Sequence, residues 1–242
     1  MLEFYKEAGL TPLEFINNIK KQFPDTKICY TARLDPMARG VVPILFGEEC
    51  KNMHNYTNLS KTYEVKIIIG YKTDSDDAMG ILENILPDNI LLNLTSSDFI
   101  SQYRDYFKIE NEITINQKYH YFSTKAISFR NKDSSKNFYH NVKLFNSKLI
   151  NNNGELDFTE WVNDCCIIID KVDKNKNFRQ KEIIDQWKSL ILFDNTKKIQ
   201  YITLQLHVGS GFFVRQYIRD ISDKIGIPLM CYDIHRISID YN

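Results

Sequence analysis

The 242-residue sequence lacks several features that would place it in a specialised class of protein. It has no excess of charge of either sign, because 31 lysines and arginines balance 31 aspartates and glutamates, and this balance excludes a uniformly basic surface. Its five cysteines are an odd number and suggest no disulfide framework, so a reducing intracellular setting is expected. No apolar run approaches the roughly 20 residues of a membrane span, and the N-terminus lacks the apolar core of a signal peptide. We therefore expect a cytoplasmic or nuclear protein without a membrane segment.

The composition is that of an ordinary globular protein large enough to bury a core. Hydrophobic residues make up 43% of the chain and charged residues 26%, so global disorder is excluded. The nine glycines and six prolines form no linker-like run. We predict one domain over 1–242, with polar insertions around 131–153, which has a loop composition, and around 171–181.

Local signals predict helices and strands that do not alternate regularly. Thr11-Pro12-Leu13-Glu14 combines a capping box with proline at the first helical position, so it opens a helix through about Gln22. Apolar patterns predict strands at 41–46, 62–70, 201–208 and 232–239. Helical spacing predicts helices at 182–193 and 214–225, the second of which ends at Gly226. This order favours an α+β fold with a mixed, mostly antiparallel sheet flanked by helices.

Acidic and basic residues are distributed unevenly along the chain. The segment 74–115 holds nine acidic residues and two basic ones, whereas 118–148 holds seven basic residues and one acidic one. Aromatic side chains are interleaved with the cations of 118–148, a composition suited to phosphates and unstacked bases. A solvated face of a strand pair would have the same composition, so this pattern alone supports both interpretations equally.

Several familiar motifs are incomplete. The turn Asp74-Ser75-Asp76-Asp77 resembles a calcium loop, but Gly80 comes one position late and Ile85 replaces the final glutamate, so we interpret the turn as structural. Cys165 and Cys166 are adjacent and belong to no CxxC, which favours core sulfurs. The histidines fall at no ligand spacing and are interpreted as surface imidazoles: His54, His120, His140, His207 and His235. We predict no metal site, and neither a complete phosphate loop nor a serine-hydrolase elbow is present.

Four short motifs occur in order along the chain. They are Leu34-Asp35-Pro36-Met37-Ala38-Arg39-Gly40, Lys61-Thr62-Tyr63, the segment from Gly70 through Thr73-Asp74 and Asp76-Asp77 to Gly80, and Gly211-Phe212-Phe213-Val214-Arg215. In this order they resemble the TruB family of pseudouridine synthases, whose signature contains Leu-Asp-Pro-x-Ala-x-Gly, Lys-x-Tyr and Thr-Asp-x-Asp-x-x-Gly. The resemblance covers 1–128 and 200–240, and it implies the pseudouridine synthase fold.

The resemblance also implies a reaction that uses neither cofactor nor metal. The bond between uracil N1 and the ribose breaks, the base rotates, and the base is rejoined to the ribose through C5. Asp35 falls at the family's essential aspartate, where a carboxylate can act as nucleophile or as general base. Arg215 matches an active-site arginine that would keep Asp35 ionised, and Tyr63 matches a tyrosine that stacks on the target base. The target uridine must flip out of its RNA to reach such a pocket.

Further residues are implied to bind substrate. Phe213 replaces a tyrosine of relatives and can still stack, and Ile234 matches an apolar wall position. Tyr30 stands where relatives carry a histidine that handles RNA, and Arg39 replaces a small residue and adds a cation near the pocket. The basic segment supplies three candidate RNA contacts: Lys125, Lys132 and Lys136.

Taken singly, these residues have simpler interpretations. Asp35 before proline is commonly a turn residue, Arg215 could lie on a helix surface, and Tyr63 could be a packing partner. Their joint order favours a monomeric, divergent TruB-like enzyme acting on structured RNA, with a tRNA T-loop as the expected substrate. We do not find the C-terminal PUA domain of many relatives. The alternatives are a catalytically silent RNA-binding or RNA-folding protein and a guided catalytic subunit of an RNA–protein complex.

Overall fold

The computed structural model describes residues 1–120, 137–191 and 198–241. The strands are β1 (Leu2–Lys6), β2 (Ile28–Tyr30), β3 (Ala38–Phe46), β4 (Lys61–Ile69), β5 (Tyr71–Thr73), β6 (Leu82–Ile85), β7 (Ile113–Lys118), β8 (Tyr139–Asp157), β9 (Lys198–Val208) and β10 (Leu229–Ile239). The helices are α1 (Pro12–Lys20), α2 (Asp88–Leu91), α3 (Ser96–Tyr103), α5 (Phe158–Lys171), α6 (Gln180–Ile191) and α7 (Val214–Ile225), with the 3-10 helices η1 (Gly47–Tyr56) and η2 (Arg104–Tyr106).

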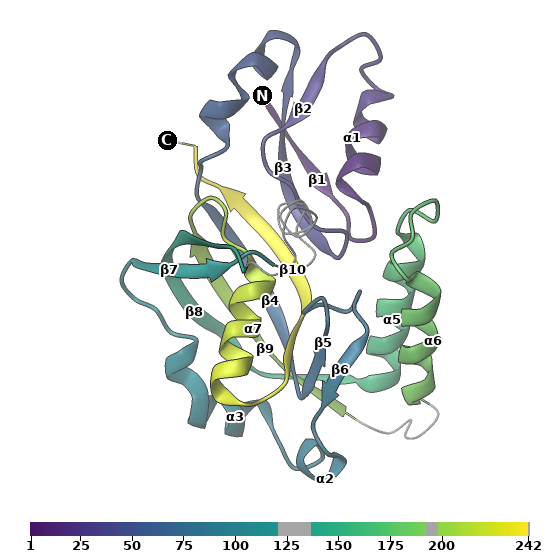
Figure 1. The fold of residues 1–242 in the computed structure, drawn as a ribbon, viewed down its shortest axis with the longest axis vertical. Coiled ribbons are helices and arrows are strands. Elements are labelled where there is room, and N and C mark those ends of the chain that lie inside the picture. Colours follow the sequence, from purple (N-terminus) through teal and green to yellow (C-terminus); the bar gives the residue numbers. More distant parts are fainter. Residues whose placement is uncertain (121–136, 192–197, 242) are drawn as a thin grey trace.

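One mixed sheet organises the described part of the chain (Figure 1). Its strands follow the order β1-β3-β10-β4-β9-β8-β7, and β2 also pairs with β3. The β3–β10 pair is parallel, and the other pairs along this sheet are antiparallel. The prediction of a mixed, mostly antiparallel sheet flanked by helices is therefore confirmed. The parallel pair matters for function because it brings the start of β3 beside the C-terminal strand.

The two faces of the sheet support two hydrophobic cores. Along β4, Ile67 and Ile69 belong to the core under α7, whereas Ile68, between them, belongs to the core under α5 and α6. This alternation follows from the two-residue period of a strand, because successive side chains point to opposite faces. Figure 1 shows α7 in front of the central strands and α5 and α6 side by side. Cys165 and Cys166 lie in the α5–α6 core, as predicted.

Local signals placed several elements correctly. The Thr11 hydroxyl accepts from the Glu14 N–H, and the Glu14 carboxylate accepts from the Thr11 N–H at 2.8 Å, so the predicted capping box forms. Helix α1 ends at Lys20, slightly before the predicted Gln22. The strands predicted at 41–46, 62–70, 201–208 and 232–239 correspond to β3, β4, β9 and β10. Gly226 ends α7 in the left-handed conformation that a helix C-cap favours.

The predicted loop around 131–153 is wrong for the part that the structure describes. Residues 139–157 form strand β8, which pairs with β7 and β9 and buries Val142 and Leu144. The asparagine-rich run interrupts the ladder without ending it, because the register shifts between Leu149 and Asn151 and again before Gly154. Pairing with β7 and β9 satisfies the backbone hydrogen-bonding groups of β8, and this outweighs its loop-like composition. The other polar tract does connect two elements, because α5 ends at Lys171 and α6 begins at Gln180.

Gly40 allows β3 and β10 to approach each other where their pairing is parallel. It lies opposite Arg236 and has φ +124°, and an added Cβ would come 2.2 Å from the Arg236 carbonyl oxygen. The Arg236 guanidinium, in turn, donates to the carbonyl oxygens of Val41, Arg33 and Ala32 at 2.7, 3.1 and 3.3 Å. This contact therefore anchors the loop that leads to Asp35.

Replacing Gly40 with alanine should destabilise the protein by about 2–4 kcal/mol, because the new methyl group overlaps fixed backbone. Gly47→Ala is the matched control, since Gly47 also has a positive φ (+56°) but open space where its Cβ would lie. We expect that control to lose only about 1 kcal/mol from backbone strain. Denaturant unfolding measures both values, and equal losses for the two variants would contradict the proposed overlap.

Candidate active site

Asp35 lies on the loop between β2 and β3, where the following proline favours an extended backbone. Several contacts hold this loop. The Lys6 ammonium is buried and donates to the carbonyl oxygens of Ala38 at 2.7 Å and Asp35 at 3.1 Å, and the Gly9 N–H donates to the Pro36 carbonyl oxygen at 2.8 Å. Burial lowers the pKa of Lys6 to about 8, although the Asp35 charge opposes this shift. These contacts fix the backbone of the Asp35 loop, whereas the Asp35 side chain remains 51% exposed.

Arg215 lies in the first turn of α7 and contacts two carboxylates at once. Its Nη2 donates to Asp35 Oδ2 at 2.6 Å, and its Nη1 lies 3.0 Å from Asp77 Oδ2 and donates to the Ser75 carbonyl oxygen at 3.0 Å. The residue is only 8% exposed, so water does little to weaken these charge-assisted bonds. A guanidinium can contact separate partners through its two terminal nitrogens, whereas a lysine ammonium has a single nitrogen.

These contacts shift the pKa values of the two carboxyl groups in opposite directions. Burial alone would raise the pKa of Asp35, but the Arg215 charge, with further help from its hydrogen bond, holds that pKa below its ordinary value. Burial raises the pKa of Asp77 despite the attraction of Arg215, and the Asp35 charge adds to this rise. Asp35 is therefore ionised at neutral pH while it faces the cavity.

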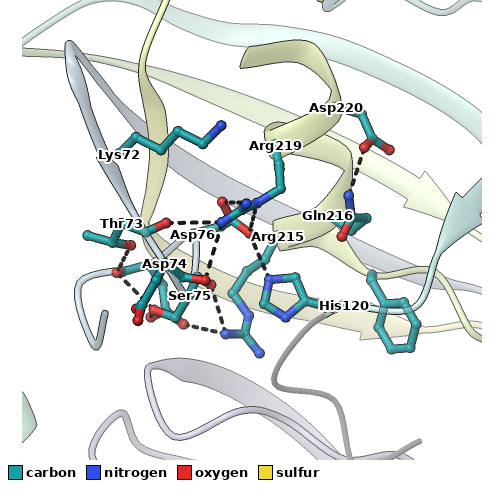
Figure 2. A network of polar contacts seen from close by, with 12 residues as sticks. Lys72, Thr73, Asp74, Ser75, Asp76, His120, Arg215, Gln216, Arg219 and Asp220 are labelled. Atoms are coloured by element: carbon teal, nitrogen blue, oxygen red, sulfur yellow. Dashed lines mark hydrogen bonds and ion pairs between the residues drawn. The ribbon is translucent and has the colours of Figure 1, made fainter. Parts of the chain in front are cut away.

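Residues of the acidic turn 74–77 contact Arg215 and Arg219, two arginines of α7 (Figure 2). Asp76 is 1% exposed and holds a left-handed backbone with φ +59°, and both of its carboxylate oxygens accept from Arg219 Nε at 2.6 and 2.7 Å. One of those oxygens also lies 2.9 Å from His120 Nε2. The Trp187 indole N–H donates to the Ala78 carbonyl oxygen at 3.0 Å, which ties the turn to α6. The structural interpretation of this turn is thus confirmed, and the turn also fixes Arg215.

A cavity of about 640 Å³ opens in front of Asp35 and Arg215. Tyr63 from β4, Phe213 before α7 and Ile234 from β10 contribute to its walls. The sheet order explains this meeting, because β4 and β10 are neighbours and β10 also lies beside β3. A volume of this size is typical of small-ligand and nucleotide sites. Four segments far apart in the sequence therefore place a charged pair, two aromatic rings and an apolar wall around one space.

Other predicted residues lie outside this cavity lining or outside the described chain. The Arg39 guanidinium donates to Asp233 at 2.9 and 2.8 Å and to the Tyr5 hydroxyl at 2.8 Å, so its charge is already paired. The Tyr30 ring lies beneath the Arg33 guanidinium at 5.7 Å. Neither Tyr30 nor Arg39 lines the cavity. Their contact with substrate stays a prediction, as do those of three lysines outside the described residues, which are Lys125, Lys132 and Lys136.

Residues to which the sequence analysis assigned no role also line the cavity. His120 was expected at the surface but is 1% exposed, and burial lowers its pKa, with the Arg215 charge acting in the same direction. Lys61 is buried, and this burial, with the nearby Arg236 charge, lowers its pKa to about 8. Tyr119 and His140 complete this group. For Tyr119, His120 and His140, only the mixture of aromatic and basic residues in 118–148 gave a signal, because their partners Asp76 and Phe213 are distant in the sequence.

Comparison with known proteins relates part of this chain to a known family. Residues 20–118 match the model of the TruB family pseudouridylate synthase (N terminal domain), a segment that includes Asp35, Tyr63 and the acidic turn. Residues 20–118 are therefore similar to a TruB-family domain. The chain is 23% identical over 244 residues to tRNA pseudouridine synthase B of Blochmanniella pennsylvanica, and the match covers 97% of this chain and 72% of that relative. Against tRNA pseudouridine synthase B of Blochmanniella floridana it is 39% identical over 80 residues, which cover 33% of this chain and 31% of the relative.

Solved structures are similar to this chain in fold. The structure described as a Cbf5–Nop10–Gar1 complex matches 97% of this chain and 47% of its own with a TM-score of 0.54 at 15% sequence identity. The predicted pseudouridine synthase fold is thereby confirmed. The chain spans less than half of that neighbour and about a third of the B. floridana relative.

Within 1–120, 137–191 and 198–241, no helix combines the length and apolar character that a bilayer crossing requires. In the same ranges, the His, Cys, Asp and Glu side chains form no group of three that could hold a metal ion.

Proposed function

We propose that this chain isomerises a flipped-out uridine in structured RNA to pseudouridine, with Asp35 as the catalytic carboxylate. The observation that carries the proposal is the Arg215–Asp35 contact of 2.6 Å at the edge of a cavity that Tyr63 also lines. An ionised, half-exposed carboxylate tied to a buried guanidinium is suited to covalent or proton-transfer chemistry on a bound base.

The reaction needs one carboxylate and a cavity that holds a free base. The bond between N1 and the ribose C1′ breaks, the base turns, and a bond between C5 and C1′ forms. The proton on C5 is lost and N1 gains one, so atoms and charge balance without an added reactant. Asp35 can act as the nucleophile or as the base in this sequence, and Arg215 keeps it ionised in either role.

The cavity walls can keep the detached base in place while it turns. Tyr63 offers a ring face for stacking, and Ile234, 5% exposed, offers an apolar surface without hydrogen-bonding demands. A base between such walls can rotate without losing fixed hydrogen bonds. The uridine must leave its stack to enter, and loops of structured RNA lose least by such flipping.

We propose tRNA as the RNA, and its T-loop as the target region. The relatives in two Blochmanniella species support this choice, because both are named tRNA pseudouridine synthase B. The unequal charge of the segments 74–115 and 118–148 is compatible with RNA as substrate, since 118–148 carries seven basic residues and one acidic one.

Unmodified tRNA transcripts and total cellular RNA, incubated with the purified chain and mapped for pseudouridine, test this proposal. We expect product at one loop position of a tRNA and none with heat-unfolded protein. Binding without product for every RNA would favour the silent RNA-binding alternative. Product that forms only after cell extract is added would favour the guided subunit. Neither binding nor product with any RNA would overturn the proposal.

A further inference from the structure

The connection between α5 and α6 carries a basic surface to which the proposed reaction assigns no role. Residues 171–181, here called the basic turn, run from the last residue of α5 to the second residue of α6. Asp173 is the acidic residue of this segment, and five residues are basic: Lys171, Lys174, Lys176, Arg179 and Lys181. All four lysines are exposed. A segment of this composition attracts polyanions.

Two of these cations are paired within the protein. Lys174 lies 3.1 Å from Asp170, one turn earlier on α5, and Arg179 lies 2.7 Å from Asp74. Among the residues that the structure describes, Lys176 and Lys181 form no ion pair. Their positive charges are therefore available to a ligand in solvent.

Local contacts give the basic turn a fixed conformation. The Gln180 side chain donates to the carbonyl oxygens of Lys176 and Asp173 at 3.1 and 3.2 Å. It also accepts from the Phe178 N–H at 3.0 Å. Val172 is buried and Phe178 packs against the α5–α6 core. The lysines therefore project from an ordered backbone, and a ligand has to order only their side chains.

One end of the basic turn lies beside the loop that carries Asp35. Gly9 packs against the last turn of α5, because a Cβ added to Gly9 would come 2.8 Å from the Cβ of Lys171. The Gly9 N–H donates to the carbonyl oxygen of Pro36, the residue that follows Asp35, at 2.8 Å. In Figure 1 this end of the α5–α6 pair is the one nearest to β1 and α1.

The other end of the basic turn lies beside the acidic turn. Both terminal nitrogens of Arg179 donate to the Asp74 carboxylate, at 2.7 and 3.1 Å. Asp74 precedes Ser75, whose carbonyl oxygen accepts from Arg215 at 3.0 Å. The basic turn is thus joined to both loops that build the Arg215–Asp35 contact, and its position relative to that contact is fixed.

This position indicates the ligand. None of the residues 171–181, all of which the structure describes, lines the cavity, so their side chains do not contact a base held there. An RNA that places one uridine at Asp35 continues outside the cavity as a chain of phosphates. Where that chain passes the loops around Pro36 and Asp74, it meets the exposed lysines. An ammonium group suits a phosphate at such a position because the contact requires no particular base.

We infer that the basic turn binds the phosphate backbone of the RNA whose uridine enters the cavity, with Lys176 and Lys181 as the main contacts. This inference rests on the proposed function and adds a second RNA-binding surface to it. The surface lies outside residues 20–118, which match the family model. Because phosphate contacts release counterions and read no bases, the basic turn should contribute affinity that depends on salt and not on RNA sequence.

Neutralising both lysines tests the inference. On the mapped RNA, the double variant Lys176→Gln, Lys181→Gln should weaken binding roughly tenfold at about 0.1 M salt, and the slope of log Kd against log salt should fall by about 1–2. In pseudouridine assays KM should rise by a similar factor while kcat stays nearly unchanged, because neither side chain reaches the cavity. Fluorescence anisotropy with labelled RNA over a series of salt concentrations measures the Kd values and the slope.

Lys188→Gln is the matched control for Lys181→Gln. Lys188 is exposed on the same helix, about two turns farther from the basic turn, so its loss removes the same charge elsewhere. We expect wild-type Kd and salt slope from Lys188→Gln, and roughly threefold weaker binding from Lys181→Gln alone. Equal losses from these two single variants would overturn the inference, because the overall charge of the chain would then set the affinity.

The failure of this inference can be distinguished from the failure of the proposed function. A double variant with wild-type Kd and salt slope would overturn the role of the basic turn, and wild-type product formation would leave the proposed function intact. RNA binding by the wild-type chain without product from any RNA would overturn the proposed function, whereas the salt slopes would still decide whether the basic turn binds phosphates. Absence of RNA binding by the wild-type chain would overturn both.

Discussion

Asp35→Asn should lower the rate of pseudouridine formation by about 10⁴-fold, because no other carboxylate in the described structure combines its exposure to the cavity with its contact to Arg215. Asparagine has the same shape and its oxygen can still accept from Arg215, so the fold keeps its contacts. Arg215 also retains the Ser75 carbonyl oxygen and Asp77. Single-turnover assays on the mapped tRNA measure the loss, and thermal unfolding checks that the midpoint changes little.

Asp25→Asn is the matched control for this experiment. Asp25 is an exposed carboxylate between α1 and β2, so its loss removes the same charge without touching the cavity. We expect wild-type rates from that variant. An Asp35→Asn protein that keeps more than a tenth of the wild-type rate would show that the carboxylate is not required. Such a result would not support the silent RNA-binding alternative, because the protein would still be active.

Arg215→Lys should lower the rate by about 10²–10³-fold although it preserves the charge, because one ammonium cannot contact Asp35, Asp77 and the Ser75 carbonyl oxygen together.

The pH profile of the Arg215→Lys variant should change as well. Arg215 holds the pKa of Asp35 below its ordinary value, so the wild-type chain should keep Asp35 ionised at pH 5. A weaker partner raises that pKa, and the acid limb of the activity profile should then move to higher pH. Arg104→Lys, at an exposed position, serves as the control.

Removing the positive charge of Arg215 altogether tests its contact with Asp77. Arg215→Met leaves Asp77, which is 3% exposed, without its positive partner and should cost about 3–5 kcal/mol of stability. Adding Asp77→Asn should restore much of that stability, because asparagine still accepts from the Ser75 hydroxyl and the Met79 N–H but carries no charge. It should not restore activity, since Asp35 still lacks its guanidinium. A double variant no more stable than Arg215→Met would contradict the role assigned to Asp77.

Much of the site followed from the order of four motifs. The structure places Asp35, Arg215 and Tyr63 at one cavity, together with Phe213 and Ile234, although their roles in catalysis and binding await the experiments above. Arg39 shows what motif order cannot predict. Its position four residues after Asp35 suggested a cation near the pocket, yet Asp233 of a distant strand pairs with it.

The sequence by itself determined the elements whose signals are local. The capping box of α1, the Gly226 end of α7 and the alternating strand β4 each depend on residues within a few positions, whose hydrogen bonds and side-chain periods are set before any long-range contact forms.

Only the tertiary structure decided which distant residues meet. Strand β8 formed from a loop-like sequence because two neighbouring strands satisfy its backbone and bury its apolar face. His120 became a buried wall residue because Asp76, on another element, binds its ring. The charge balance of the whole chain did not indicate that the buried Arg215 contacts both Asp35 and Asp77, because electrostatic attraction depends on distance and burial and not on position along the chain.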